Sequence, residues 1–409
     1  MAIDTIGTNA IANDAVNAAK IAAGAVDADI TAIPDGSVST AKLADNAVTG
    51  AKLYAENLGR RNLVINGAMQ IAQRGTSHTQ SPNAGNYHTV DRFSYRRQGT
   101  WSGVTAVALS QQTTGGPTGL PYFLRYAPTG SDSTTPADTS MYVDYKFEDK
   151  DTVSLSFGNS DAQPFTLSFY VRSTVTGTFS VTFSDAASSA PFTRYVTTYT
   201  INAANTWERK IINVPAITSG TWSTTGRSLS IYFMVSGDSD GSSATSTLNQ
   251  WSTHGSADIR FATTQTEGMT NQTGQTWDIT GIQLESGDTA TPFEHHGYGE
   301  ELSLCQRYFQ IGGHCTGRSY SGTQAELYYH FLTEMRTSPS ISMRGAGNAN
   351  NYDTGQVHIS GVGTYDLTAV AASQPNPTGT VFRPTTSGNW GAGNIVGLRG
   401  NIANIDAEL

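Results

Sequence analysis

The segment FTLSFYVRS, residues 165–173, alternates apolar and polar side chains with a period of two. In an extended chain this alternation places all of its large apolar residues on one face. The segments VSLSFGN (153–159), FSVTF (179–183) and SLSIYFMVS (228–236) repeat the pattern, and TWERKIINVP (206–215) and WDITGIQLE (277–285) are two more candidate strands. Gly, Ser, Asp and Asn separate these segments. Half-buried strands at such intervals predict an antiparallel β-sandwich or jelly roll, with at least eight strands before residue 290.

Residues 1–60 follow a different rule, because a lone apolar residue recurs every five positions. The anchors are Ile6, Ile11, Val16, Ile21 and Val26, and then, after a shift of register, Ile33, Val38, Leu43, Val48, Leu53 and Leu58. Steps of five residues do not collect on one face of an α-helix, and in a flat strand they alternate between faces. The chain must therefore turn within each repeat, as a one-chain solenoid or as a shaft of intertwined identical chains. A flexible linker is the remaining alternative. We expect a homotrimeric shaft, since eleven pentads are close to the minimum length of a solenoid.

The region after residue 299 combines one helical pattern with a second set of strands. YGEELSLCQRYFQI (298–311) predicts a short helix that joins two β-domains. The β pattern returns in AELYYHFL (325–332), QVHISGVGTYDLTAV (356–370) and NIVGLRGNIANIDAEL (394–409), for which we expect a compact sandwich. The predicted fold class is mainly β, with a repeat shaft over 1–60, a jelly-roll sandwich over 61–299 and a smaller C-terminal β-domain over 300–409.

Composition narrows the classes of function. Charged residues make up 14% of the chain and the net charge is −9, which argues against nucleic acid as a partner. The start lacks the pattern of a secretory signal, and no run of about eighteen apolar residues predicts membrane insertion. The only cysteines, Cys305 and Cys315, are expected to be free thiols in a protein made in a reducing cytoplasm.

Several sequence segments of the chain resemble the tail fibres and receptor-binding proteins of tailed bacteriophages. They are NLVINGAMQIAQRG (62–75), VDRFSY (90–95), the block from ITGIQLE to CQRYF (279–309), EMRTSPSI (334–341) and DAEL (406–409). The Val-x-x-Ala-Lys-Leu repeats resemble the fibre segment that often precedes such domains. The resemblance implies a trimeric virion protein, assembled in the host cytoplasm and located in the tail. Its N-terminal segment would bind other tail proteins, and its distal domains would contact a polysaccharide or other receptor on the host surface.

The block from residue 62 to residue 285 also resembles the jelly roll of carbohydrate-binding modules. The matching positions are Asn62, Leu63, Asn66, Gly67, Ile282, Leu284 and Glu285. The acidic residues that hold a structural calcium in that family are absent, because Gln70, Thr280 and Gly281 occupy their positions. We therefore expect no metal and no cofactor.

Residues suited to catalysis are present, but their spacing does not favour an enzyme. Asp144, Glu148 and Asp149 in VDYKFEDKD (143–151) are expected on an exposed strand and turn, and GDSDGSS (237–243) is expected to be a turn. Adjacent histidines at 295 and 296 point to opposite faces of an extended chain, so they do not predict a metal site. The expected function is non-enzymatic attachment. A purely structural fibre or decoration protein and a depolymerising tailspike are the alternatives.

Tryptophans supply the candidate receptor contacts, since a sugar ring stacks its C–H face on a flat aromatic ring. Trp101, Trp222, Trp251 and Trp390 are flanked by small polar residues that are typical of loops, and we expect them to bind the receptor. Trp207 and Trp277 fall within strand patterns and are expected in the core.

Overall fold

The structure is a computed structural model of the 409-residue chain. It describes residues 60–409 except 81–85, 186, 188–190, 219–221, 224, 256–259, 344–355, 361, 387–390 and 399–402. The part of the chain that the structure describes lies within one compact unit, Arg60–Leu409. The pentad repeats and their trimeric shaft lie outside the described residues, so that part of the expected architecture stays a prediction.

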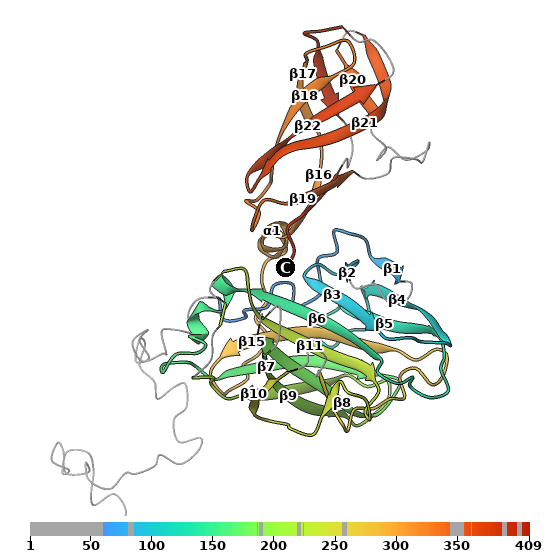
Figure 1. Ribbon diagram of the computed structural model, residues 1–409, viewed down its shortest axis with the longest axis vertical. Coiled ribbons are helices and arrows are strands. Elements are labelled where there is room, and N and C mark those ends of the chain that lie inside the picture. The colour runs from blue at the N-terminus through green and yellow to red at the C-terminus, as the bar shows by residue number, and fades with distance from the viewer. Residues whose placement is uncertain are drawn as a thin grey trace, which may run out of the picture. The chain divides into compact units, whose positions relative to one another are not determined.

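Two antiparallel sheets form a β-sandwich between residues 77 and 286 (Figure 1). The first sheet has six strands in the order β1 (Ser77–Gln80), β4 (Val104–Gln112), β5 (Phe123–Gly130), β15 (Trp277–Ser286), β7 (Phe165–Ser173) and β10 (Glu208–Val214). The second has seven, in the order β13 (Trp251–His254), β9 (Phe192–Ile201), β8 (Gly177–Asp185), β11 (Arg227–Gly237), β6 (Ser140–Glu148), β3 (Phe93–Gln98) and β2 (Asn86–Tyr87). Two short strands, β12 (Ala244–Thr245) and β14 (Phe261–Ala262), pair in parallel.

The core lies between the two sheets and is built from the residues that alternate inward. Phe165, Leu167, Phe169 and Val171 of β7 are fully buried in it, as the period-two pattern predicts. Trp277 of β15 is also fully buried, and its indole N–H donates to the Tyr199 hydroxyl at 3.1 Å. The strands predicted over 165–173, 179–183, 206–215, 228–236 and 277–285 are therefore confirmed.

The strand predicted over 153–159 is wrong. Residues Asp149–Asp151 and Val153–Leu155 form two short 3₁₀ turns, η5 and η6, and Ser156 has a left-handed backbone with φ of 48°. The turn aims Leu155 into the core, whereas Val153 is 75% exposed. Three alternating residues are compatible with one 3₁₀ turn as well as with a strand, because a segment this short does not separate the two periods.

Asn62 and Gly67, near the start of the described chain, form hydrogen bonds with strand β15. These contacts, which we call the clamp, join the two segments that resemble carbohydrate-binding modules. The Asn62 amide accepts from the main-chain N–H groups of Val64 (3.0 Å) and Leu284 (3.1 Å) and donates to the Ile282 carbonyl (3.1 Å). Gly67 accepts from the Ile282 N–H at 3.0 Å. A Cβ atom at Gly67 would lie 2.1 Å from the Ile282 carbonyl oxygen, so only glycine permits this approach.

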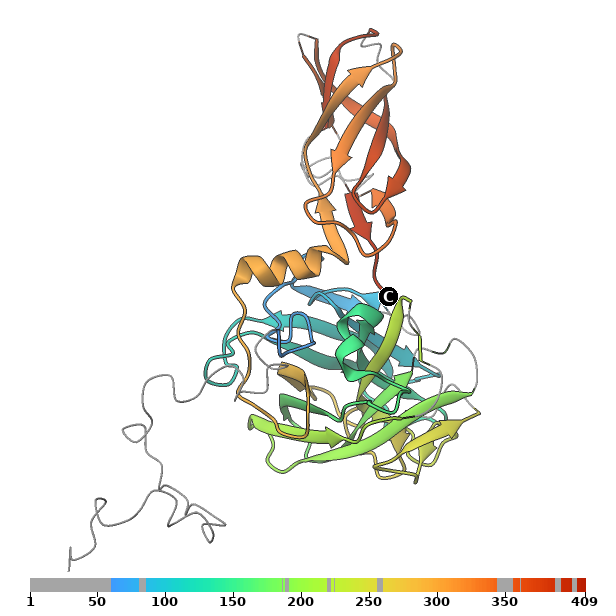
Figure 2. The same cartoon turned by 90° about the vertical axis from the view of Figure 1, so that its left-hand side faces the viewer.

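Helix α1 (Tyr298–Gln306) follows the sandwich and confirms the helix expected near residue 300. Cys305 at its end and Tyr308 beyond it are buried against Ile65 and Ile71, so the helix packs on the first described segment, drawn blue in Figure 2. Both cysteines are buried free thiols.

The remaining strands form a small sheet and a closed barrel instead of the expected compact sandwich. The sheet has the order β16 (Phe309–Gly312), β24 (Ala403–Asp406) and β19 (Ser340–Met343). The barrel has the order β17 (Cys315–Ser319), β18 (Ala325–His330), β22 (Gly379–Thr386), β21 (Gly363–Asn376), β20 (Gln356–Ile359) and β23 (Ile395–Leu398). Closure leaves the barrel no unpaired edge, and its core is much smaller than that of the sandwich.

We predict that Asn62→Ala destabilises the sandwich by about 3 kcal/mol, because three main-chain groups lose their buried partner at about 1 kcal/mol each. Urea unfolding followed by tryptophan fluorescence measures the change. The matched control is Asn159→Ala, whose amide makes only exposed contacts within its own turn and should change stability by less than about 0.5 kcal/mol. Equal effects of the two substitutions would show that the clamp does not hold the sandwich together.

Candidate functional site

The tryptophans expected to contact a receptor lie at different depths in the sandwich. Trp101 is 7% exposed, packs in the core, and donates from its indole N–H to the Gln98 carbonyl at 2.9 Å. Trp222 and Trp251 are half-buried, with ring centroids 5.7 Å apart, and Trp222 stacks on Phe157 at 4.5 Å. Trp390 lies outside the described residues. Direct contact of these rings with a ligand stays a prediction.

Trp207 differs from its expected place in a strand. It precedes β10, is half-buried, and packs edge-on against Phe123 at 5.2 Å. The Arg172 guanidinium lies 4.7 Å from its ring centroid. Trp207 therefore covers the outer surface of the six-stranded sheet instead of filling the core.

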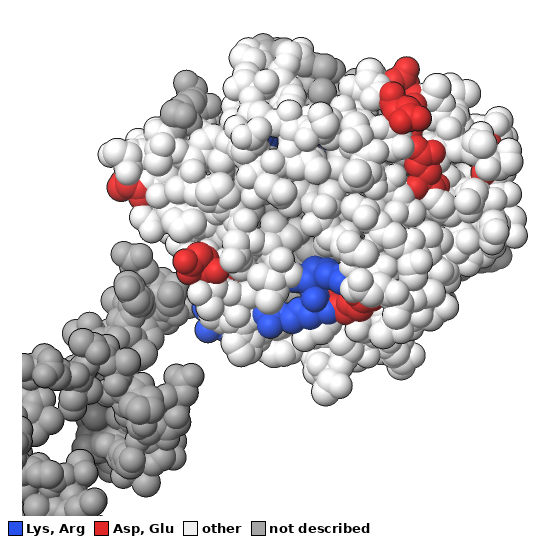
Figure 3. Space-filling view, turned by 90° about the horizontal axis from the view of Figure 1, so that it is seen from below, with Lys and Arg blue, Asp and Glu red and all other residues white. Residues whose placement is uncertain are grey.

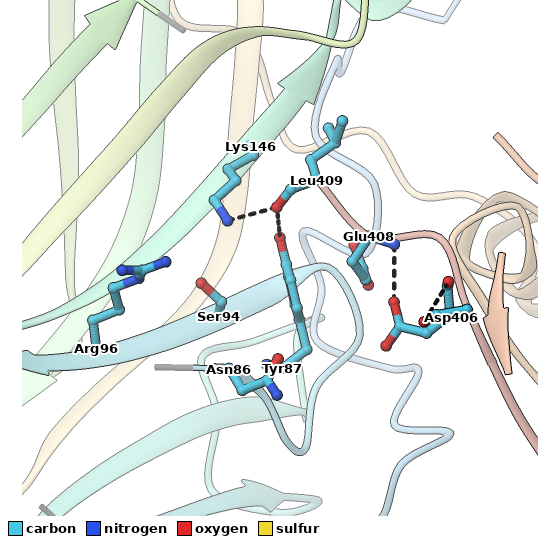
Figure 4. A pocket seen from close by; sticks show the side chains of 9 residues that line it. Asn86, Tyr87, Ser94, Arg96, Lys146, Asp406, Glu408 and Leu409 are labelled. Atoms are coloured by element: carbon cyan, nitrogen blue, oxygen red, sulfur yellow. Dashed lines mark hydrogen bonds between the residues drawn. The ribbon is translucent and has the colours of Figure 1, made fainter. Parts of the chain in front are cut away.

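A pocket of about 370 Å³ lies where the outer face of the seven-stranded sheet meets the last strand of the chain. We call it the junction pocket, and Figure 4 shows its lining: Asn86, Tyr87, Ser94, Arg96, Lys146, Ser340, Asp406, Glu408 and Leu409. Its size falls within the range of roughly 300–1,000 Å³ that is usual for small-molecule sites. Hydroxyl, amide and charged groups dominate the lining.

The alternation of side chains along β3 and β6 places Ser94, Arg96 and Lys146 on one wall of the pocket, which we call the basic wall. Phe93 and Tyr95 of β3 point into the core, so the side chains of Ser94 and Arg96 lie on the outer face. Across the ladder, Ser94 pairs with Asp144 and Arg96 pairs with Tyr142. The Ser94 hydroxyl donates to the Asp144 carboxylate. Lys146, two residues further along β6, projects on the same side.

Asp406 and Glu408, at the end of the chain, form the opposite wall, which we call the acidic wall, and both form ion pairs with arginines. Glu408 pairs with Arg92, which is fully buried, and with Arg74 at 3.4 Å. Asp406 pairs with Arg74 at 3.1 Å and accepts from the Glu408 N–H at 2.9 Å. Both carboxylates therefore have their charge compensated from behind the pocket wall.

The two cations of the opposite wall have fewer partners. Lys146 is 8% exposed, donates from Nζ to the Leu409 main-chain oxygen at 2.6 Å, and lies 3.9 Å from the Asp144 carboxylate. Burial lowers the pKa of Lys146 below its ordinary value; Asp144 opposes the shift, whereas Arg96 and Arg227 add to it. Arg96 is exposed and makes no hydrogen bond or ion pair within the part of the chain that the structure describes.

Unsatisfied polar atoms lie in the sheet beside the pocket. Asp144 and Ser230 are at most 1% exposed, and neither the Asp144 Oδ2 atom nor the Ser230 hydroxyl has a hydrogen-bond partner. Ser230 of β11 stands directly opposite Lys146, and Tyr232 stands opposite Asp144. Buried polar atoms of this kind are rare in folded proteins, which marks this part of the sheet as a place where a bound water or ligand group is expected.

The burial of strand β6 contradicts one expectation from the sequence. Asp144 and Glu148 were expected on an exposed strand, yet both faces of β6 are buried. The Lys146 side chain is covered by Leu409, Tyr142 packs on Phe261, and Glu148 binds Arg307 at 3.0 Å. Lys146 and Glu148 are therefore covered by residues that follow them by more than 100 positions, and Asp144 is bound by Ser94 of the neighbouring strand β3.

No motif of known spacing identifies the pocket. Arg92 and Ser94 belong to the segment VDRFSY (90–95), which resembles phage proteins but does not by itself predict a pocket. Arg96 and Lys146 carried no signal of their own, since an isolated cation on a strand is usually solvated. In the described part of the chain, no group of three His, Cys, Asp or Glu side chains is arranged to hold a metal ion. No helix among the described residues is long and apolar enough to span a membrane.

Surface charge is sparse in the view from below, where most of the visible residues are neither acidic nor basic (Figure 3). The few lysines and arginines seen there lie close together. This agrees with the low charged fraction of the chain.

Comparisons with known proteins give fold likenesses of low similarity. No family model matches the chain, and no curated protein matches it. The enzymatically active domain of tailspike protein 4 of bacteriophage CBA120 is 8% identical over 55% of this chain, with a TM-score of 0.28, and the match spans 21% of that protein's length.

Two carbohydrate-binding modules are similar at the same level. The family 11 module of a cellulosomal cellulase from Clostridium thermocellum is 14% identical, with 53% of this chain and all of that module covered and a TM-score of 0.25. The xylan-binding CBM22-2 domain from Paenibacillus barcinonensis is 11% identical, with coverages of 47% and 91% and a TM-score of 0.26. Likenesses of this size assign neither a family nor a ligand to the chain.

The carboxylate next to the acidic wall generates a pH prediction. Asp91 is 1% exposed and accepts from the Gln73 N–H at 3.0 Å, and burial raises its pKa to about 6 despite the nearby Arg74. Since the pKa of Asp91 in the folded protein exceeds its pKa in the unfolded chain, protonation of Asp91 stabilises the folded state. This stabilisation is fully present below about pH 4 and is lost as the pH rises through about 6.

We therefore predict that the wild type gains up to about 3 kcal/mol of stability relative to Asp91→Asn when the pH falls from 7 to 4. Urea unfolding of both proteins at each pH measures the difference. The control Asn159→Ala, which replaces an exposed uncharged side chain, should give a difference that does not change with pH. A pH-independent difference for Asp91→Asn would mean that this carboxyl titrates normally.

Proposed function

We propose that this chain is a non-enzymatic glycan-binding protein that attaches a bacteriophage tail to a polysaccharide or other receptor on the host surface. The observation that carries the glycan-binding part is the chemistry of the junction pocket. A sugar presents alcohol groups that both donate and accept hydrogen bonds. The pocket offers hydroxyls from Ser94, Ser340 and Tyr87, the Asn86 amide and two cations, in a volume suited to one or two sugar rings.

The pocket is better suited to binding than to hydrolysis. Glycoside hydrolysis needs two carboxyl groups, one of which gives up a proton to the leaving oxygen. Both carboxylates that line the pocket are already engaged by arginine, Glu408 by Arg92 and Arg74 and Asp406 by Arg74. We therefore propose recognition without catalysis. A jelly-roll topology for the sandwich belongs to the same proposal.

The proposed role in a virion rests on the sequence segments that resemble phage proteins. The segment VDRFSY supplies Arg92 and Ser94, EMRTSPSI supplies Ser340, and DAEL supplies Asp406, Glu408 and Leu409, so three of those segments meet at the junction pocket. In the proposed virion, residues 1–60 bind other tail proteins, and the β-domains face the host. Three chains in one fibre would convert weak sugar binding into useful avidity.

The glycan-binding proposal is tested by filling the pocket. The full-length chain is applied to an array of bacterial surface polysaccharides, together with Ser340→Trp, which places an indole at the pocket rim from an exposed position on β19. We expect the parent to bind at least one glycan and Ser340→Trp to weaken that binding at least tenfold, with an unchanged melting temperature.

The matched control is Ser338→Trp, which adds the same ring at a nearby exposed position that does not line the pocket, and it should bind like the parent. Binding by Ser340→Trp at parental strength would place the glycan site elsewhere. Failure of the parent to bind any glycan or host cell would favour a purely structural protein. Release of reducing sugar from a bound polysaccharide would show a tailspike enzyme instead.

We further predict a homotrimer, because pentad anchors within one chain bury too little apolar area to offset about 1–2 kcal/mol of backbone entropy per ordered residue. Light scattering of the intact chain should give three times the chain mass. Replacing Val38, Leu43 and Val48 by Ser should shift the mass towards the monomer while the β-domains still unfold cooperatively. A monomeric parent would contradict the trimeric shaft.

A further inference from the structure

The junction pocket has an imbalance of charge that neutral sugar binding does not explain. Its two carboxylates are paired with Arg74 and Arg92, which lie behind the pocket wall. On the opposite wall, Arg96 has neither a hydrogen bond nor an ion pair within the described residues, and its guanidinium lines the open cavity (Figure 4). The charged group of the pocket that is available to a ligand is therefore a cation.

The surroundings of Arg96 increase this imbalance. Lys146 lies in the same wall, where Arg96 and Arg227 add to the lowering of its pKa and the Asp144 and Glu408 carboxylates oppose it. Arg260 covers the neighbouring rings of the sheet, with its guanidinium 5.3 Å from the Tyr142 centroid. Two cations, Arg96 and Lys146, therefore line this wall of the pocket in a chain whose net charge is −9.

Concentrated positive charge is destabilising unless an anion offsets it. Like charges near one another raise the free energy of the folded state, and a partly buried lysine adds its desolvation penalty. The Asp144 Oδ2 atom accepts no hydrogen bond, and its distance of 3.9 Å from Lys146 leaves that ion pair loose. The charges of Lys146 and Arg96 are therefore incompletely compensated, and an anion bound in the pocket would offset them.

We infer that the junction pocket selects a sugar that carries a negatively charged group, a carboxylate or a phosphate, and that Arg96 contacts this group. The inference rests on the proposed function, because it requires that a glycan occupies this pocket. The planar guanidinium of Arg96 can donate two parallel hydrogen bonds to one carboxylate or phosphate. Lys146, one strand away, adds a second positive charge, and the hydroxyls of Ser94 and Ser340 remain for the sugar alcohols.

Matched pairs of glycans test the inference on the full-length chain. The array carries galacturonan with galactan, sialylated with desialylated oligosaccharides, and phosphomannan with mannan. We expect the acidic member of at least one pair to bind at least tenfold more tightly than its neutral partner, with a preference that weakens between 50 and 300 mM salt. The pairs separate a carboxylate from a phosphate as the source of the charge.

Two substitutions of Arg96 assign the effect to this residue. Arg96→Gln should abolish the preference for the acidic member, and Arg96→Lys should retain part of it, since charge remains but the two-pronged geometry is lost. The control Arg318→Gln removes an exposed arginine of β17 that does not line the pocket, and it should leave the preference unchanged. Circular dichroism melting verifies that each variant is folded.

The outcomes separate this inference from the proposed function. Glycan binding that is blocked by Ser340→Trp but shows no preference for acidic members, or a preference that survives in Arg96→Gln, would overturn the inference and leave the glycan site in place. Absence of binding to every glycan, acidic or neutral, would overturn the proposed function and the inference together.

Discussion

The burial of the Arg92 guanidinium is the constraint on which the arrangement of this molecule depends. Arg92 is fully buried, and an uncompensated charge in that position would cost several kcal/mol. Its partners come from three distant parts of the chain: the Glu408 carboxylate, the Lys146 carbonyl at 2.7 Å and the Tyr308 ring at 3.5 Å. Docking of the end of the chain and of the segment after α1 therefore supplies partners to this buried charge.

The junction pocket is a consequence of this docking. Glu408 pairs with Arg92, so the last residues of the chain are held over the outer face of the seven-stranded sheet, where Leu409 accepts from Lys146. A polar sheet face that would otherwise be an open surface becomes one wall of a cavity. The acidic groups of the opposite wall are paired with Arg74 and Arg92, whereas Arg96 lines the cavity without an ion-pair partner among the described residues.

Strand β6 shows why polar residues on a strand are poor guides to exposure. Its inward residues follow the period-two rule and fill the core, as Val143, Tyr145 and Phe147 do. Its outward residues, Asp144, Lys146 and Glu148, are at most 8% exposed. Ser94 of β3 binds Asp144, the end of the chain covers Lys146, and Arg307 just after α1 binds Glu148. Each of these charged groups has an ion-pair partner, which reduces the desolvation penalty of its burial.

The sequence by itself determined the features that depend on local periodicity and local contacts. Alternation in 165–173, 179–183 and 228–236 specified strands and their inward faces, and the uninterrupted pattern after Gly299 specified α1. It did not determine the η6 turn, where three alternating residues suit two conformations, nor the closed barrel, whose closure depends on pairing between strands far apart in the sequence. Only the tertiary structure decided the candidate site, because Arg96, Lys146 and Glu408 are unremarkable charged residues along the chain. Their chemistry arises from desolvation and from partners 50 to 316 positions apart in sequence, such as Ser94 with Asp144 and Arg92 with Glu408, and neither property is encoded in the neighbourhood of any one residue.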